Sequence, residues 1–262
     1  MERFDVFPLY SPELRKMKTI RVFVPEREGF AERALPVLYM HDGQNLFEDH
    51  TASFGVSWNI REAIRDAKKE GVKPWIVVGV DSEPDDRWNE YSPFPCDDFA
   101  MKVKSKQMPE GGMAEAYVAF LVQTLKPWID YHYPTDPAKT ALAGSSMGGL
   151  VSVFAAIRHP AVFPQIGAFS PAWWFHSTAS MRMLEEADFT NSVRIYQDMG
   201  TTETSNAKIA DFPQIYLRGA RQAAAILEGK AILEWLYLEF EGAVHNEAAW
   251  ASRFGDFLRW LQ

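Results

Sequence analysis

The stretch 140–158 constrains the fold more than any other part of the chain. A short apolar run, TALA at 140–143, is followed by the pentapeptide GSSMG at 144–148 and by a segment of helical character at 150–158. A strand, a tight glycine-rich turn and a helix in this order are typical of a nucleophile elbow, whose central residue is held at strained backbone angles. The pattern predicts an α/β fold in which Ser146 projects from the carboxyl edge of a sheet.

Apolar strand patterns alternate with helical patterns along the rest of the chain. Strands are predicted at 19–24, 35–40, 75–80, 140–143, 165–169, 193–199 and 235–240, and helices at 58–69, 114–131, 150–158, 209–227 and 247–261. Continuous apolar runs such as WIVVGV at 75–80 are expected of parallel strands covered on both faces. The alternation predicts a mostly parallel central sheet with helices on both faces. No repeat or linker interrupts the chain, so we expect a single domain over residues 1–262.

The stretch 81–113 is the exception to this alternation. It lacks clear periodicity and is longer than a simple connection between elements. Loops of this length inside a domain are usually functional or mobile. Arg87, Trp88 and Tyr91 are therefore candidates for a lid, with a solvated surface loop as the alternative.

Composition excludes several classes of protein. The chain has 27 Lys and Arg against 35 Asp and Glu, a net charge of −8, which argues against nucleic-acid binding because phosphate contacts require clustered basic residues. The single cysteine, Cys96, can form neither an intramolecular disulfide nor a Cys-based zinc cluster. No apolar stretch approaches the roughly 20 residues of a membrane-spanning helix, and no secretory signal is visible. We expect a cytoplasmic protein without a membrane or nucleic-acid partner; the sequence leaves its oligomeric state open.

A serine nucleophile needs a base, because a free hydroxyl is almost fully protonated at neutral pH. In sheet folds of this type the order along the chain is serine, acid, histidine. Three histidines follow Ser146: His159 ends a helix, His176 lies in an aromatic-rich loop, and His245 follows the last predicted strand. A loop that leaves the carboxyl end of a parallel strand brings its side chains to the edge where Ser146 lies, so His245 is the predicted base.

The acid that orients this base should lie between Ser146 and His245, just after a strand. Asp198 is near the end of the predicted strand 193–199, and Glu203 is in the loop that follows it. Placement in the loop favours Glu203, with Asp198 as the alternative acid.

Two loops are candidates for the oxyanion hole. The backbone N–H of Met147, directly after the predicted nucleophile, can point at a developing oxyanion. A second donor is expected after the predicted strand 35–40, where Gly43 allows close approach of the backbone to a substrate, so Gly43 or Gln44 is favoured. His41 and Asp42 in the same loop could instead be metal ligands, but no second ligand pair at metal-binding spacing supports this, and no metal is predicted.

The aromatic stretch after the predicted strand 165–169 leaves the sheet beside the elbow. Trp173 and Trp174 are therefore candidate substrate-binding residues, and ordinary core packing is the alternative for both.

Five segments spread over nearly the whole chain resemble the putative-esterase family of α/β-hydrolases. They are VLYMHDGQNLF (37–47), ALAGSSMGGL (141–150), GAFSPAWW (167–174), MGTTE (199–203) and GAVHNEAAWASRF (242–254). That family includes esterase D-like enzymes, feruloyl and acetyl-xylan esterases, and enterobactin-type esterases. The resemblance implies an α/β-hydrolase domain with Ser146 as nucleophile and His245 as base. It places Glu203 where many relatives have Asp, while the loop 41–44 departs from the His-Gly form of several members.

The function that the resemblance implies is that of a serine carboxylic-ester hydrolase. It would act through an acyl-enzyme on a small, sugar or aromatic ester, without a metal or an organic cofactor. An acyltransferase on the same fold would share every catalytic residue and differ only in excluding water. A non-catalytic binding module is disfavoured because the serine, the histidine and an acid are all present.

Overall fold

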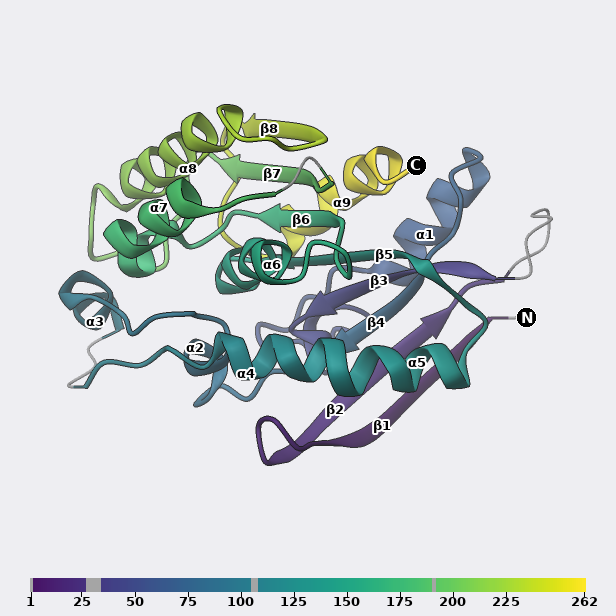
Figure 1. Ribbon diagram of the computed structural model, residues 1–262. Helices are drawn as coiled ribbons and strands as arrows, with labels where there is room; N and C mark the ends of the chain where they lie inside the picture. Colours follow the sequence, from purple (N-terminus) through teal and green to yellow (C-terminus); the bar gives the residue numbers. More distant parts are fainter. Residues whose placement is uncertain (1, 27–33, 105–107, 190–191) are drawn as a thin grey trace. The chain divides into compact units, whose positions relative to one another are not determined.

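The computed structural model describes residues 2–26, 34–104, 108–189 and 192–262 (Figure 1). In these residues eight β-strands follow the order β1-β2-β4-β3-β5-β6-β7-β8, mostly parallel, with helices between them. The predicted α/β class and mostly parallel sheet are confirmed. The chain forms two compact units, which are Met1–Glu83 with Ala116–Ala143 and Asn246–Gln262, and Pro84–Glu115 with Gly144–His245.

The first unit contains an antiparallel hairpin joined to parallel strands. Its strands are β1 (Arg3–Ser11), β2 (Lys16–Val24), β3 (Leu35–His41), β4 (Ile76–Val80) and most of β5 (Thr135–Ser145). β2 pairs antiparallel with β1 and β4, whereas β3 pairs parallel with β4 and β5. The sequence patterns missed β1, which carries Pro8 inside an apolar alternation; a proline is tolerated there because β1 ends the strand order and needs no donor on its outer side.

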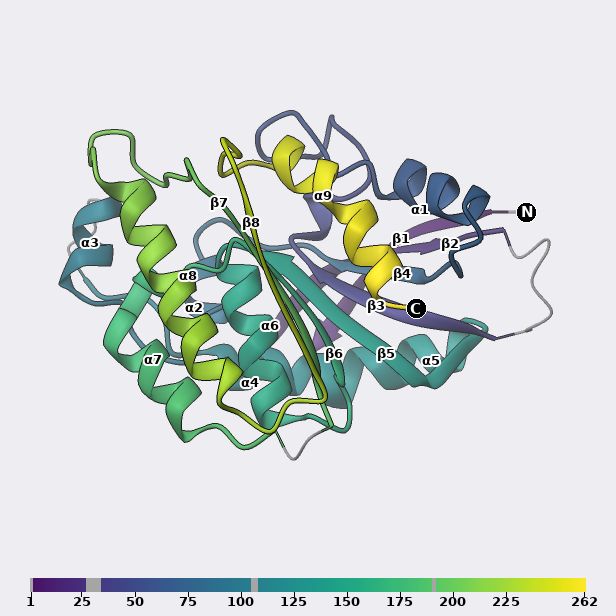
Figure 2. The same ribbon diagram turned by 90° about the horizontal axis from the view of Figure 1, so that it is seen from above.

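Helices cover both faces of these strands. α1 (Ile60–Lys69) and α9 (Glu247–Trp260) lie on one face and α5 (Lys126–His132) on the other (Figure 2). The helix predicted at 114–131 consists of α4 (Ala114–Ala119), a π-helical segment (Phe120–Leu125) and α5. Pro127 at the start of α5 cannot donate a backbone hydrogen bond, and the widened π turn directly before it accommodates this loss.

The second unit contains three parallel strands, β6 (Gln165–Phe169), β7 (Arg194–Gly200) and β8 (Glu234–Phe240). α6 (Met147–Arg158), α7 (Ser177–Glu186) and α8 (Phe212–Glu228) lie on one face of them (Figure 2). β7 pairs parallel with both β6 and β8, so the carboxyl ends of all three strands meet at one edge. The loops after β6, β7 and β8 therefore emerge together.

The stretch 81–113 is not a solvated loop. Outside residues 105–107, which the structure does not describe, it contains α2 (Arg87–Glu90), α3 (Asp98–Lys104) and a bridge between Pro95 and Gly111. Trp88 and Tyr91 are buried, and the Trp88 ring packs edge-on against Phe175 at 4.8 Å between centroids. Helices of four and seven residues are too short to produce a readable period, which is why the sequence did not reveal them.

Candidate active site

Ser146 occupies a sharp turn between β5 and α6. Its backbone angles, φ 57° and ψ −118°, lie outside the regions that L-residues ordinarily occupy. The turn is held by neighbouring backbone, because Ser146 N–H donates to the Phe169 carbonyl at 2.9 Å and the Ser146 carbonyl accepts from Ala172 N–H at 3.0 Å. The loop after β6 therefore fixes the elbow that the pentapeptide predicted.

His245 lies in the loop after β8, where the sequence placed it. This loop is bound along its length to the loop after β7, since Thr202 N–H and Oγ1 both donate to the Ala243 carbonyl, at 3.1 and 2.9 Å. Gly200 makes the approach possible: a Cβ at this position would come within 2.3 Å of the Ala243 carbonyl oxygen. The two loops thus bring His245 to Glu203.

Glu203 is the carboxylate that contacts the imidazole. The Nδ1 atom of His245 lies 2.5 Å from Glu203 Oε2, and the Glu203 side chain is completely buried. The other oxygen, Oε1, accepts from Gly200 N–H at 2.7 Å and from the Ser170 hydroxyl. Both oxygens therefore have hydrogen-bond donors, as a buried carboxyl group requires.

Asp198, the alternative acid, serves a different part of the same region. It is fully buried in β7 and contacts Ser170 N–H at 3.3 Å and the Tyr196 hydroxyl at 3.3 Å. Ser170 has φ 47° and also donates its hydroxyl to Glu203. Asp198 therefore holds the Ser170 turn, and Ser170 in turn contacts Glu203.

Two hydroxyl residues near the base were not singled out from the sequence. The Tyr216 hydroxyl lies 3.2 Å from His245 Nε2 and 2.6 Å from Ser205 Oγ. Burial raises the pKa of Tyr216 above its usual value, so the phenol keeps its proton. Tyr216 repeats with Phe212 and Ala220 at helical spacing, a pattern that also describes ordinary core, and no sequence signal separates the two.

The predicted oxyanion donors lie at element starts. Met147 is the first residue of α6, where a backbone N–H has no carbonyl of its own helix to reach. In the first unit, Asn45 N–H and Leu46 N–H are bonded within the loop 42–46 to the carbonyls of Asp42 and Gly43. The assignment of Gly43 or Gln44 as the second donor stays a prediction.

The loop that carries Gly43 is fixed to the end of β4. Ser82 Oγ donates to Asp42 Oδ1 at 2.6 Å, and the Gln44 side chain accepts from Ser82 N–H and donates to Ser82 Oγ, both at 3.0 Å. A Cβ on Gly43 would lie 2.8 Å from the Gly79 carbonyl carbon and 2.9 Å from Val80 N. Glycine is required here because the loop backbone rests on the backbone of β4.

We expect Gly43→Ala to lower the free energy of unfolding by about 1–3 kcal/mol, because the added methyl group must displace backbone atoms. Urea denaturation measures the loss. Gly255→Ala in α9 is the matched control, since its Cβ would meet only the end of the Arg259 side chain at 3.6 Å. A Gly43→Ala protein as stable as the control would contradict the close approach.

The two predicted pocket residues differ in their surroundings. Trp173 belongs to the core. Its Nε1–H donates to Gln197 Oε1 at 3.2 Å, and the Gln197 amide nitrogen donates to the Ala220 carbonyl. Trp174 packs edge-on against Tyr216, at 6.0 Å between ring centroids. Its Nε1 is buried and has no hydrogen-bond partner in the described part of the chain. Of the two, Trp174 is therefore placed beside Tyr216, whose hydroxyl contacts His245.

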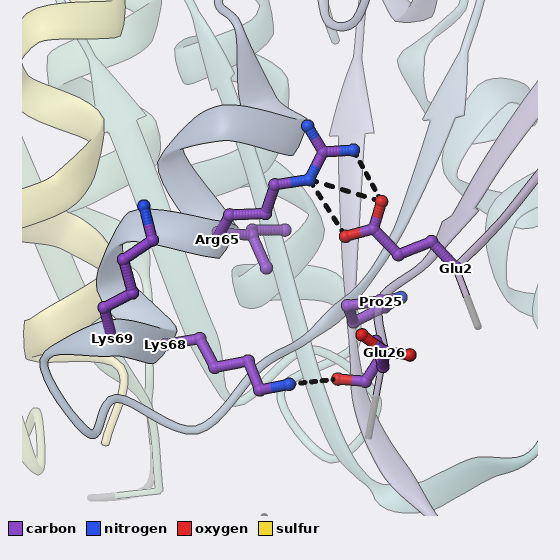
Figure 3. Close-up of a pocket in the computed structure, with 7 residues that line it drawn as sticks. Glu2, Pro25, Glu26, Arg65, Lys68 and Lys69 are labelled. Atoms are coloured by element: carbon purple, nitrogen blue, oxygen red, sulfur yellow. Dashed lines mark hydrogen bonds and ion pairs between the residues drawn. The ribbon is translucent and has the colours of Figure 1, made fainter. Parts of the chain in front are cut away.

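A surface pocket of about 700 Å³ beside α1 is a different feature (Figure 3). Arg65 pairs with Glu2 at 2.5 Å, and Lys68 Nζ donates to the Glu26 carbonyl at 3.0 Å. None of the predicted site residues lines this pocket, and its cationic groups are already paired.

The described residues hold no group of three or more His, Cys, Asp or Glu side chains arranged to bind a metal ion. No helix in that part of the chain combines the length and apolar character needed to cross a bilayer.

Comparisons with known proteins agree with this geometry. Residues 11–261 match the family model described as Putative esterase. An uncharacterized Bacillus subtilis protein, YbbA, is 25% identical over 244 residues, covering 92% of this chain and 90% of that protein. The ferri-bacillibactin esterase BesA of Bacillus subtilis is 28% identical over 189 residues, which cover 64% of this chain and 61% of BesA. The crystal structure of the BES protein from Bacillus cereus superposes with a TM-score of 0.76 at 20% identity, over 99% of this chain and 94% of that one.

The fold and the family match together define the class of protein: an α/β-hydrolase that acts on carboxylic esters. The family match spans nearly the whole chain, and the chain belongs to the putative esterase family. The resemblance seen in the five sequence segments is confirmed.

Proposed function

We propose that this chain hydrolyses small-molecule carboxylic esters through an acyl-enzyme on Ser146, with His245 as base and Glu203 as the orienting acid. The observation that carries the proposal is the 2.5 Å contact between His245 Nδ1 and Glu203 Oε2 in the unit that also holds the Ser146 elbow. A buried, fully hydrogen-bonded carboxylate on Nδ1 fixes the imidazole tautomer in which Nε2 carries the lone pair that can take a proton.

The reaction then has two steps. His245 Nε2 takes the proton of Ser146 Oγ while Oγ bonds to the ester carbonyl carbon, and the same proton passes to the departing alkoxide. Water repeats the sequence to release the acid and restore Ser146. Met147 N–H is the proposed donor to the oxyanion in the unit that holds Ser146.

A comparison of ester and peptide substrates separates an esterase from a peptidase. We expect p-nitrophenyl esters to be cleaved and peptide p-nitroanilides to be left intact, and a fluorophosphonate to label Ser146. Addition of alcohol acceptors tests acyl transfer: product ester in excess of free acid would contradict a hydrolase. A panel of feruloyl, acetyl-sugar and siderophore esters then ranks substrate classes. If the folded protein cleaves none of these esters, the proposal is wrong.

Acyl chains beyond roughly C6 to C8 are expected to be cleaved more slowly than shorter ones. No large apolar cap domain was evident in the sequence, and Trp174 with its aromatic neighbours fills the space beside Tyr216. A shallow pocket cannot bury further methylene groups at about 0.8 kcal/mol each. The measurement is kcat/KM on p-nitrophenyl esters of increasing length; a steady rise to C12 would contradict the expectation.

The extent of the domain, its location and the substrate group are part of the same proposal. We propose that the whole chain acts as one hydrolase domain in the cytoplasm on a small ester with an aromatic or sugar group. Trp174 is the proposed contact for that group, because its ring packs edge-on against Tyr216, whose hydroxyl contacts His245.

A further inference from the structure

The base of the proposed triad is in contact with one hydroxyl group that hydrolysis does not require, and a second hydroxyl contacts the first. Tyr216 on α8 places its hydroxyl 3.2 Å from His245 Nε2, and its ring lies 4.8 Å from the imidazole between centroids. Ser205 Oγ lies 2.6 Å from the same phenol oxygen. Burial raises the pKa of Tyr216, so the phenol keeps its proton beside the imidazole.

The positions of the protons follow from the partners. Glu203 is an acceptor, so His245 Nδ1 carries a proton and donates it. Nε2 therefore presents a lone pair, and the neutral Tyr216 phenol donates to it. Because Tyr216 has a single proton, Ser205 must be the donor in the contact between the two hydroxyls. The resting order is Ser205 O–H to Tyr216 O–H to His245 Nε2.

We infer that Tyr216 and Ser205 form a reversible hydroxyl chain that stabilises the protonated form of His245 during catalysis. When Nε2 receives the Ser146 proton, Tyr216 turns its O–H toward Ser205 and accepts from Nε2–H. Only the Ser146 proton changes partner; Tyr216 and Ser205 each keep their own. Tyr216 is thus a positioning residue for the base, and this inference rests on the proposed function.

Reversal of the hydroxyl chain favours the reaction because it replaces a neutral hydrogen bond by a charge-assisted one, while the number of hydrogen bonds stays the same. The resting chain has two bonds between neutral groups, whereas the reversed chain begins with a charged donor, and charge-assisted bonds are roughly twice as strong. An interaction that is stronger in the transition state than in the ground state raises kcat. The expected benefit is about 5- to 10-fold.

Nitrogen-15 NMR of the histidines tests the resting bond without any substrate. In labelled Tyr216→Phe protein at a pH where His245 is neutral, we expect the Nε2 resonance to move toward that of an unbonded imidazole nitrogen. Ser205→Ala should leave this resonance in place, because Tyr216 still donates. Tyr237→Phe is the matched control, since its hydroxyl contacts Glu239 at 2.8 Å on β8. An Nε2 resonance that does not move in Tyr216→Phe overturns the inference.

Kinetics test the reversal itself. Tyr216→Phe and Ser205→Ala should each lower kcat on a p-nitrophenyl ester about 5- to 10-fold with little change in KM, and the double variant should lose no more than Tyr216→Phe alone. Losses that multiply in the double variant, or a Ser205→Ala enzyme with unchanged kcat, overturn the chain. If Tyr216→Phe does not fold, Ser205→Ala alone decides, since reversal requires its loss of kcat. Failure of the proposed function appears separately, as activity that survives Ser146→Ala.

Discussion

Ser146→Ala is expected to lower kcat for ester hydrolysis about 10³-fold or more, because the members of a catalytic triad act as a unit and the hydroxyl is the attacking group. The variant should remain folded. Alanine meets the same backbone strain at φ 57° as serine does, and the bonds that hold the turn to Phe169 and Ala172 are made by backbone atoms. Circular dichroism and steady-state kinetics on a short-chain p-nitrophenyl ester measure the two properties.

Ser145→Ala is the matched control for this variant. Ser145 is also buried and directly precedes the elbow as the last residue of β5, so its replacement makes the same chemical change one residue away. It should keep much of the activity and still react with a fluorophosphonate. Mass spectrometry that finds the phosphonate on Ser145 or on another residue would remove Ser146 from the role of nucleophile.

The parts of the fold that were predictable from sequence are those encoded by neighbouring residues. The elbow, β6 and the His245 loop each show an apolar run next to a distinct turn, so local pattern and tertiary position agree. β1 was missed because a half-exposed edge strand has a weak alternation interrupted by Pro8. The short helix α2 carries too few residues to show a period.

The environment of the base was not predictable for a different reason. Ser170, Glu203, Tyr216 and His245 lie on separate loops and helices, and the contacts among them join residues 29 to 42 positions apart. Nothing in the local sequence of Tyr216 separates a phenol that meets an imidazole from one that fills a core. Such contacts depend on the register of β7 and β8 and on the bonds between the loops that follow them.

The acid of the triad gives the second large effect. Glu203→Gln is expected to lower kcat about 10²- to 10⁴-fold, because an amide nitrogen facing His245 Nδ1 favours the wrong imidazole tautomer and no longer stabilises the imidazolium. Asp198→Asn should lower kcat far less. Its carboxyl group contacts Ser170 N–H and the Tyr196 hydroxyl, both at 3.3 Å, so its loss weakens the turn that supports Glu203 without changing the partner of Nδ1.

The two substitutions form a matched pair, since each replaces one fully buried carboxyl group by its amide in the same unit. Thermal unfolding should show that both proteins are folded. We expect the free energy of unfolding to fall by about 1–3 kcal/mol where a buried acceptor is lost. Activity is then compared at equal folded concentration. Glu203 lies beyond Gly200 in a loop and reaches Nδ1 directly, whereas the direction of Asp198 is set by the pleat of β7. A larger loss of kcat in Asp198→Asn at unchanged stability would transfer the role of acid to Asp198, and the buried contact between Glu203 and His245 would then be structural only.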